Sequence, residues 1–238
     1  VEARRQLSSL LGHFDLLPEP VARVEDFSIP GQDNKRIRMR LYSATCEARL
    51  QPAMLYFHGG GFVIGDLDTT DAILRTLAIQ SGLVILSVDY RLAPEYPYPA
   101  GAEDALEAYR WVLDHGHNLG IDANRLGLGG DSAGGNLCLN VSFQSKRKRI
   151  KRPTFQSLIY PWVDLGNSAI ADSSMIELAK GFGLTGTMLD YFRRHAFSQS
   201  IDFEDFMVSP CHAKKADLKA LPPTFIQVCG FDPLNIIL

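Results

Sequence analysis

The chain contains 238 residues, of which 46% are hydrophobic and 21% are charged, and its formal net charge is −3. These proportions are typical of a single globular domain with a sizeable core. The near-neutral balance provides no global basic field, which argues against nucleic acid or a membrane surface as a partner. The one dense basic run, Lys146–Arg152, is interpreted as the solvated end of a helix and the loop after it.

Four widely separated cysteines, Cys46, Cys138, Cys211 and Cys229, lack the C-x-x-C spacing of metal and redox motifs. We expect free thiols in a reducing compartment, with Cys138 and Cys229 buried in apolar runs. No apolar run reaches transmembrane length, and the amphipathic N-terminus differs from a signal peptide. These features predict a cytoplasmic protein.

The predicted elements begin with a helix over residues 1–12 and an antiparallel hairpin formed by Val21–Ile29 and Lys35–Tyr42. Beyond the hairpin, strands alternate with helices, apart from a proline-rich loop at residues 91–100. Short apolar runs predict strands at 53–57, 83–88, 126–128, 155–160 and 224–229. Apolar residues at helical spacing predict helices at 69–80, at 101–114, from Asn136 onward and at 187–197.

This alternation predicts an α/β fold with a mostly parallel central sheet and helices on both faces. Ligands of such folds bind at the carboxyl ends of the strands. Three groups of candidate residues directly follow predicted strands: His58–Gly61, Ser132 and Asp232. One edge of the sheet is therefore expected to collect them. The alternation lapses over residues 163–207, and an insertion of this length commonly forms a lid or a binding wall.

Ser132 is the central candidate, because it occupies the middle of the G-x-S-x-G pattern formed by residues 130–134. In this pattern a strand turns sharply into a helix and holds the serine hydroxyl above the sheet. The turn needs residues without Cβ, which explains Gly130, Gly134 and Gly135. An ordinary glycine-rich strand-to-helix turn would also fit the five residues taken alone.

Acyl transfer through serine also needs hydrogen-bond donors for an oxyanion. The backbone N–H of Ala133 lies at the start of the predicted helix, and the triple glycine after His58 supplies further N–H groups. A flexible turn or a phosphate cradle is the alternative for this glycine loop. Its spacing matches neither G-x-x-x-x-G-K-[ST] nor G-x-G-x-x-G, so nucleotide binding is the weaker interpretation.

Asp232 is the candidate carboxylate for orienting a catalytic base. It ends a predicted strand 100 residues after Ser132, in the order Ser…Asp found in this type of fold. The simple alternative is an Asp-Pro pair that initiates a turn. Asp164 is a weaker competitor at the start of the 163–207 insertion.

These residues carry a family resemblance. The chain resembles the hormone-sensitive-lipase-like carboxylesterases of the α/β-hydrolase superfamily from about residue 20 to 234. The matching motifs are HGGGFVIGD (58–66), DYRLAPEYPYPA (89–100), GDSAGGNL (130–137), LIYPWVD (158–164), GFGLTG (181–186) and FIQVCGFDPL (225–234).

The resemblance implies an α/β-hydrolase core, with a cap made from residues 1–20 and 163–207. It also implies hydrolysis of short- to medium-chain carboxylic esters without a cofactor or metal. The implied nucleophile is Ser132, the implied acid is Asp232, and the implied oxyanion donors are Gly60, Gly61 and Ala133. Supporting motif residues are His58, Gly59, Gly130, Asp131 and Gly134. Candidate walls of an apolar substrate site are Phe62, Tyr90, Tyr98, Phe182 and Leu184.

The chain departs from the family pattern in one respect. The family's catalytic histidine follows the acid after a further helix and strand, whereas here six residues follow Asp232 and none is histidine. None of the six histidines present stands in the required position: His13, His58, His115, His117, His195 and His212. We therefore expect a chain that lacks the C-terminal helix, strand and histidine loop, has little esterase activity alone and forms homodimers through an uncovered sheet edge. The alternatives are a small-molecule-binding protein resembling the plant gibberellin receptors, and a structural fragment.

Overall fold

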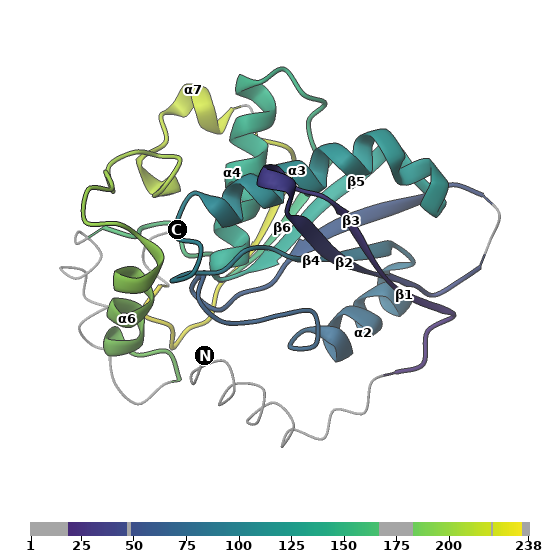
Figure 1. Ribbon diagram of the computed structural model, residues 1–238, viewed down its shortest axis with the longest axis horizontal. Helices are drawn as coiled ribbons and strands as arrows, with labels where there is room; N and C mark the ends of the chain where they lie inside the picture. Colours follow the sequence, from purple (N-terminus) through teal and green to yellow (C-terminus); the bar gives the residue numbers. More distant parts are fainter. Residues whose placement is uncertain (1–18, 47–48, 167–182, 220, 235–238) are drawn as a thin grey trace.

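The computed structural model describes residues 19–46, 49–166, 183–219 and 221–234 (Figure 1). Within these ranges the chain forms one seven-stranded sheet in the order β1-β2-β4-β3-β5-β6-β7. The strands are β1 (Arg23–Pro30), β2 (Arg36–Ser43), β3 (Gln51–Phe57), β4 (Val84–Asp89), β5 (Ile121–Asp131), β6 (Gln156–Ile159) and β7 (Thr224–Gln227). The helices are α2 (Asp71–Ser81), α3 (Ala100–His115), α4 (Ala133–Arg147), α6 (Gly186–Ala196) and α7 (Lys215–Leu218), with 3₁₀ turns η1 (Gln32–Asn34), η2 (Gly116–Leu119) and η4 (Pro210–His212).

The sheet has an antiparallel part and a parallel part. β1 pairs antiparallel with β2, and β2 pairs antiparallel with β4. From β4 through β3, β5 and β6 to β7 every pairing is parallel. The predicted hairpin, the predicted strands and the four predicted helices beyond it are thus confirmed. The helix expected over residues 1–12 lies outside the described residues.

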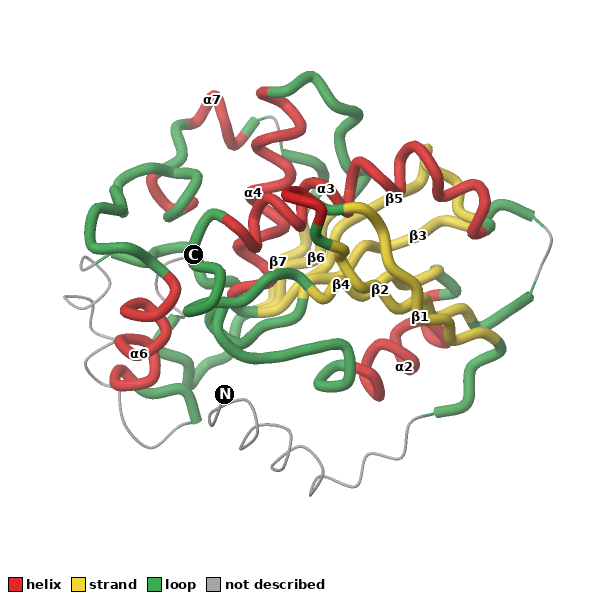
Figure 2. The backbone as a smooth tube through the Cα atoms, viewed as in Figure 1, coloured by secondary structure: helices red, strands yellow, loops and turns green. Residues whose placement is uncertain are grey.

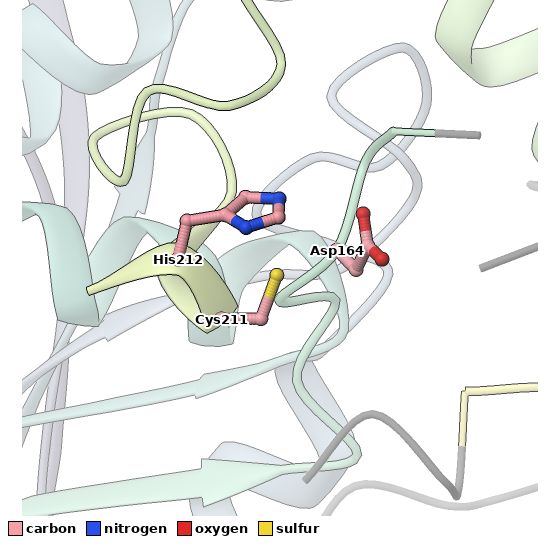
Figure 3. A group of neighbouring side chains, drawn as sticks. All are labelled: Asp164, Cys211 and His212. Atoms are coloured by element: carbon pink, nitrogen blue, oxygen red, sulfur yellow. The ribbon is translucent and has the colours of Figure 1, made fainter. Parts of the chain in front are cut away.

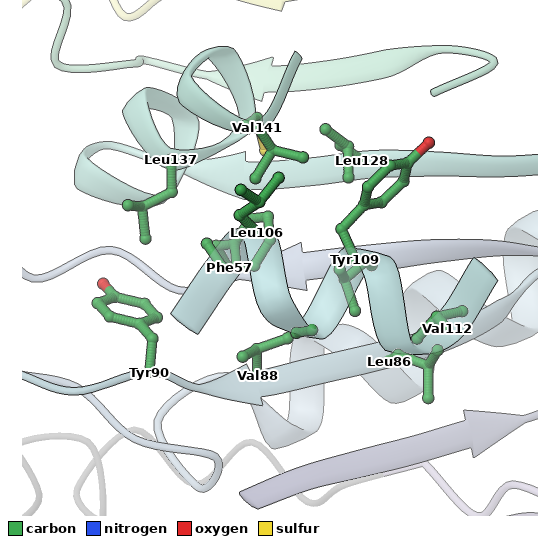
Figure 4. Packing of buried hydrophobic residues seen from close by; sticks show 14 of the residues in the cluster. Phe57, Leu86, Val88, Tyr90, Leu106, Tyr109, Val112, Leu128, Leu137 and Val141 are labelled. Carbon is green, nitrogen blue, oxygen red and sulfur yellow. The ribbon is translucent and has the colours of Figure 1, made fainter. Parts of the chain in front are cut away.

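Helices cover both faces of the sheet, as predicted (Figure 2). One face packs against α3 and α4, and Figure 4 shows the side chains that interdigitate there. Its large buried residues include Phe57, Leu86, Val88 and Leu128 from strands, Leu106, Tyr109 and Val112 from α3, and Leu137 and Val141 from α4. The other face packs against α2 through Tyr42, Met54, Tyr56, Leu74, Ala78 and Ile85. Full burial of one large apolar side chain contributes about 1.5–3 kcal/mol, so these two layers hold the sheet rigidly beneath its loops.

A further apolar cluster combines α6 with loops that follow the strands. Leu189 and Phe192 of α6 pack with Val63, which follows β3, and with Trp162, which follows β6. The side chain of Thr185 caps α6 by accepting a hydrogen bond from the N–H of Met188 at 3.2 Å. The helix predicted at 187–197 is therefore present, and its apolar face meets loops at the carboxyl ends of the strands. Residues 167–182 of the same insertion lie outside the described residues.

The four cysteines are free, as expected, and Cys138 is buried. The expectation for Cys229 is wrong, because this residue is only partly buried where β7 gives way to a turn.

Lys146–Arg149 are exposed at the end of α4, which agrees with a solvated helix end. Among the described helices, none combines the length and the apolar character needed to cross a bilayer.

Candidate active site

Ser132 connects the last residue of β5 to the first residue of α4 in a strained conformation. Its φ of 52° and ψ of −118° lie in a region that residues with a Cβ rarely adopt. The backbone is held there by three hydrogen bonds. Its N–H donates to the carbonyl of Ile159 at 2.9 Å, and its carbonyl accepts from the N–H groups of Trp162 at 3.0 Å and Asn136 at 3.3 Å. Strain of this kind costs about 1–3 kcal/mol and persists where surrounding structure enforces it, typically at functional sites.

The glycines around Ser132 are required by close approach of the backbone. A Cβ on Gly134 would overlap the carbonyl of Phe57 in β3, and a Cβ on Gly130 would lie 2.5 Å from the Gly134 carbonyl carbon. A Cβ on Gly135 would lie 2.6 Å from the Pro161 Cβ. The close packing of α4 against β3 and β5 therefore matches the sequence argument for a nucleophile elbow.

The glycine loop that follows β3 is an ordered turn. The carbonyl of Gly60 accepts hydrogen bonds from Val63 and Ile64, both at 3.0 Å. Gly60 and Gly61 have φ values of 109° and 60°, where glycine is favoured, and a Cβ on Gly61 would overlap the ring of Phe192. The fixed path of this loop fits a set of preorganised donors better than a flexible turn.

Asp131 joins the glycine loop to the elbow. Its Oδ1 accepts a hydrogen bond from the N–H of Gly59 at 3.0 Å and another from the hydroxyl of Tyr56 at 2.8 Å. Burial raises the pKa of this carboxyl group, and the two hydrogen bonds oppose that effect. The residue before the candidate nucleophile therefore fixes the start of the candidate oxyanion loop, a role that sequence spacing did not reveal.

His58 and Tyr90 support the glycine loop. The two rings are stacked with centroids 4.4 Å apart, and the Tyr90 hydroxyl donates to the His58 carbonyl at 2.7 Å. Nδ1 of His58 lies 2.7 Å from the Gly59 carbonyl oxygen, to which it donates. Burial lowers the pKa of His58 to about 4, so its imidazole is neutral at pH 7. Tyr90 was expected to line the substrate site, but it is 2% exposed and its contacts indicate support of the loop.

Of the other expected wall residues, Phe62, Tyr98 and Leu184 pack against the apolar cluster that contains α6. The Phe62 ring lies 5.7 Å from that of Phe197 and 6.3 Å from that of Trp162. Trp162 and Phe197 are buried, whereas Phe62 is partly exposed, so among these three rings Phe62 presents apolar surface beside the glycine loop. Phe182 lies outside the described residues.

Asp232 follows β7 at the same edge of the sheet that carries the elbow. Its Oδ1 accepts a hydrogen bond from the N–H of Leu234 at 2.9 Å, and partial burial raises the pKa of its carboxyl group. The competing carboxylate, Asp164, accepts from the N–H of Gly166 at 2.8 Å and belongs to a cluster with Cys211 and His212.

No histidine is hydrogen-bonded to Ser132 within the described ranges. The ring nitrogens of His115 and His195 face carbonyls of their own helices, at 3.1 Å from Trp111 and 2.7 Å from Tyr191. His117 is exposed in η2. His58 serves the glycine loop, His212 faces Glu204, and His13 lies outside the described residues.

The comparisons with known proteins agree with this geometry. A family model described as the alpha/beta hydrolase fold matches residues 54–236. A parallel sheet with a serine elbow at its edge defines that class of protein, and the chain belongs to the α/β-hydrolase fold family.

Particular relatives extend this result. The chain is 39% identical to the esterase LipI of Mycobacterium tuberculosis, over 99% of this chain and 72% of LipI. It is 33% identical to an ethyl acetate hydrolase of Pseudomonas putida, over 98% of this chain and 73% of that enzyme. The solved esterase of Pyrobaculum calidifontis superposes with a TM-score of 0.92 at 38% identity, over 98% of this chain and 74% of that chain. The resemblance seen in the sequence motifs is thereby confirmed.

Proposed function

We propose that the chain is a serine carboxylic ester hydrolase in which Ser132 is the nucleophile. The observation that carries the proposal is the strained Ser132 elbow, tied through Asp131 to the neighbouring glycine loop. The names of LipI and of the Pseudomonas and Pyrobaculum proteins support ester hydrolysis as the reaction.

In the proposed reaction, Oγ of Ser132 attacks the ester carbonyl and transfers its proton to a base. The carbonyl oxygen becomes an oxyanion, to which the N–H groups of Gly60, Gly61 and Ala133 donate. Loss of one such donor costs about 10²–10³ in rate, so three donors account for much of the acceleration. The N-terminus of α4 adds favourable dipole charge. The protonated base then protonates the departing alkoxide, and water releases the acid from the acyl-enzyme with renewed help from the base.

The base is proposed to be a histidine outside the described residues, oriented by Asp232. None of the five described histidines is hydrogen-bonded to Ser132. In the family that the chain resembles, the catalytic histidine follows the acid. Partial burial raises the pKa of the Asp232 carboxyl group. This environment is compatible with the proposed role, because a half-buried carboxylate interacts more strongly with an imidazolium than an exposed one does.

Short- to medium-chain esters are the proposed substrates. The partly exposed ring of Phe62, which packs on the buried rings of Trp162 and Phe197, provides an apolar surface for an acyl group. The ethyl acetate hydrolase among the relatives is in keeping with a short acyl chain. We expect p-nitrophenyl butyrate to be hydrolysed faster than a long-chain triglyceride. Treatment with EDTA should leave turnover unchanged, since no step of the proposed reaction uses a metal.

A small-molecule-binding protein on the same scaffold is the second candidate. It is favoured by one observation, the absence of a histidine contact to Ser132 among the described residues. Specific thermal stabilisation by an acidic small molecule, without turnover of any ester, would favour this alternative. For both candidates we propose a cytoplasmic location, in keeping with the four free cysteines, and homodimer formation through the edge at β7.

The decisive experiment is the substitution Ser132→Ala in a protein that also contains the proposed catalytic histidine. Hydrolysis of p-nitrophenyl butyrate should fall by about 10³ or more, because the acyl-enzyme cannot form. Ser198→Ala, which removes an exposed serine hydroxyl bonded to Ser200, is the matched control and should retain activity. Activity of the Ser132→Ala protein within a few-fold of the unmodified protein would refute the assignment, provided that circular dichroism shows the same fold.

A further inference from the structure

Three side chains with different donor atoms meet beside the 3₁₀ turn η4. Asp164 lies in the segment that follows β6, and Cys211 and His212 belong to η4 itself. One ligand atom from each residue lies within 4.8 Å of the other two. Figure 3 shows the Cys211 sulfur directed toward the imidazole of His212, with Asp164 on the neighbouring segment.

The two segments that carry these side chains are held together by hydrogen bonds. The N–H of Cys211 donates to the Val163 carbonyl at 3.1 Å, and the N–H of Leu165 donates to the Ser209 hydroxyl at 3.1 Å. Asp164 is only 5% exposed, and Ser209 is fully buried. The backbone of the two segments is therefore already in place, and rotations of the side chains would bring the three donor atoms closer together.

The imidazole of His212 is an incompletely paired group in this cluster. Its Nε2 is inaccessible to solvent and has no hydrogen-bond partner in the part of the chain that the structure describes. Its Nδ1 lies 3.6 Å from Oε2 of Glu204, whose side chain is 79% exposed. The side chain of His212 is 27% exposed, so the ring can rotate to present a nitrogen to a ligand, and two carboxylates nearby make the surroundings favourable for positive charge. Both features point to a cation as the missing partner.

We propose that Asp164, Cys211 and His212 form a binding site for Zn²⁺. Thiolate, imidazole and carboxylate are the ligands that zinc takes in proteins, whereas Mg²⁺ and Ca²⁺ prefer oxygen alone. Ligand atoms of a tetrahedral zinc site lie about 3.5 Å apart, so the cluster must contract by about 1 Å. On binding, the Cys211 thiol releases its proton to solvent and its sulfur forms the bond to zinc. Water or Glu204 completes the coordination.

Bound zinc would link the segment after β6 to the segment that leads through α7 to β7. A cation that binds only the folded chain stabilises it by mass action. This role is independent of the proposed reaction at Ser132. The C-x-x-C rule applied to the sequence could not reveal such a site, because Asp164 is 47 residues from Cys211.

The test is a titration of the purified, tag-free, reduced protein with Co²⁺, which reports cysteine coordination spectroscopically. We expect one cobalt ion per chain, with a sulfur-to-cobalt charge-transfer band in the near ultraviolet that disappears when Zn²⁺ is added. Cys211→Ser should remove the band, and His212→Ala and Asp164→Asn should each weaken binding at least tenfold. Cys229→Ser is the control and should keep the full band. Zn²⁺ should raise the melting temperature of the unmodified protein but not that of Cys211→Ser.

A charge-transfer band of equal size in the Cys211→Ser protein would overturn the proposal, as would the absence of any band in the unmodified protein. Circular dichroism in the absence of metal distinguishes loss of a ligand from loss of the fold. The Ser132→Ala protein should bind cobalt normally, so failure of the metal site and failure of the proposed esterase activity give separate results.

Discussion

At the residue scale, Asp131 holds the two halves of the candidate site in register. Its side chain accepts from Gly59, and its main chain leads directly into Ser132. The proposed oxyanion donors of the glycine loop, Gly60 and Gly61, follow Gly59 immediately. Since a displacement of about 1 Å can cost 10²-fold in rate, a carboxylate that sets this spacing controls activity without touching the substrate.

Substitution of Asp131 tests this positioning role. Asp131→Ala leaves the Tyr56 hydroxyl and the Gly59 N–H without their acceptor, so we expect a loss of about 2–5 kcal/mol of stability and at least a tenfold loss of kcat. Asp131→Asn keeps an acceptor oxygen and should recover most of both quantities. These proteins are assayed in a form that contains the proposed catalytic histidine. Equal kcat values for the Asp131→Ala protein and the unmodified protein would show that Asp131 has no positioning role.

The buried imidazole of His58 should make the folding stability of the protein depend on pH. Its pKa is lowered from 6.5 to about 4 in the folded state, so the unfolded chain binds a proton that the folded chain excludes. Stability therefore falls as pH drops from about 6.5 to 4, by about 3 kcal/mol in total. Urea unfolding between pH 7 and 4 measures this slope. His58→Gln should flatten it, whereas His117→Gln, at an exposed position, should not.

At the element scale, the sequence predicted the strands and helices to within a few residues, because their apolar periodicity is strong. The hairpin β1–β2 and the strand–elbow–helix at Ser132 are examples. The contacts of Asp131 with Gly59 and of Tyr90 with His58 could not be predicted, because they join residues 72 and 32 positions apart and leave no local pattern. The 3₁₀ turn η4 could not be predicted either, because its three residues are too few to show helical periodicity.

Strand β7 exposes large apolar side chains at the edge of the described sheet. It pairs with β6 on one side and with no described strand on the other, and its residues Phe225 and Ile226 are 61% and 47% exposed. Unpaired edges of this kind pair with other chains. We expect this chain to associate with increasing concentration, and Phe225→Lys should weaken the association at least tenfold. Sedimentation velocity measures both effects. Ile73→Lys on α2, where the apolar side chain is 60% exposed, should leave association unchanged.

At the scale of the whole molecule, the sheet brings the proposed nucleophile, the candidate oxyanion donors and a carboxylate to one edge. Rigid layers of side chains beneath that edge keep these groups in place without a ligand. Acyl transfer also depends on a base, and no histidine in the described ranges is hydrogen-bonded to Ser132.

The 238-residue chain is expected to fold but to hydrolyse esters very slowly. None of the histidines that the structure describes is hydrogen-bonded to Ser132, and a serine without an adjacent imidazole keeps the high pKa of an alcohol and is a poor nucleophile at neutral pH. Serine hydrolases that lack a triad member retain about 10³–10⁴ over the uncatalysed rate, from oxyanion binding and substrate binding alone. Turnover of p-nitrophenyl butyrate by this chain should accordingly lie far below the usual 1–10³ per second, and Ser132→Ala should lower it little further.

If the unmodified chain reaches ordinary rates and Ser132→Ala abolishes them, a histidine of this sequence is the base. His212→Ala and His195→Ala would then be the first variants to identify it.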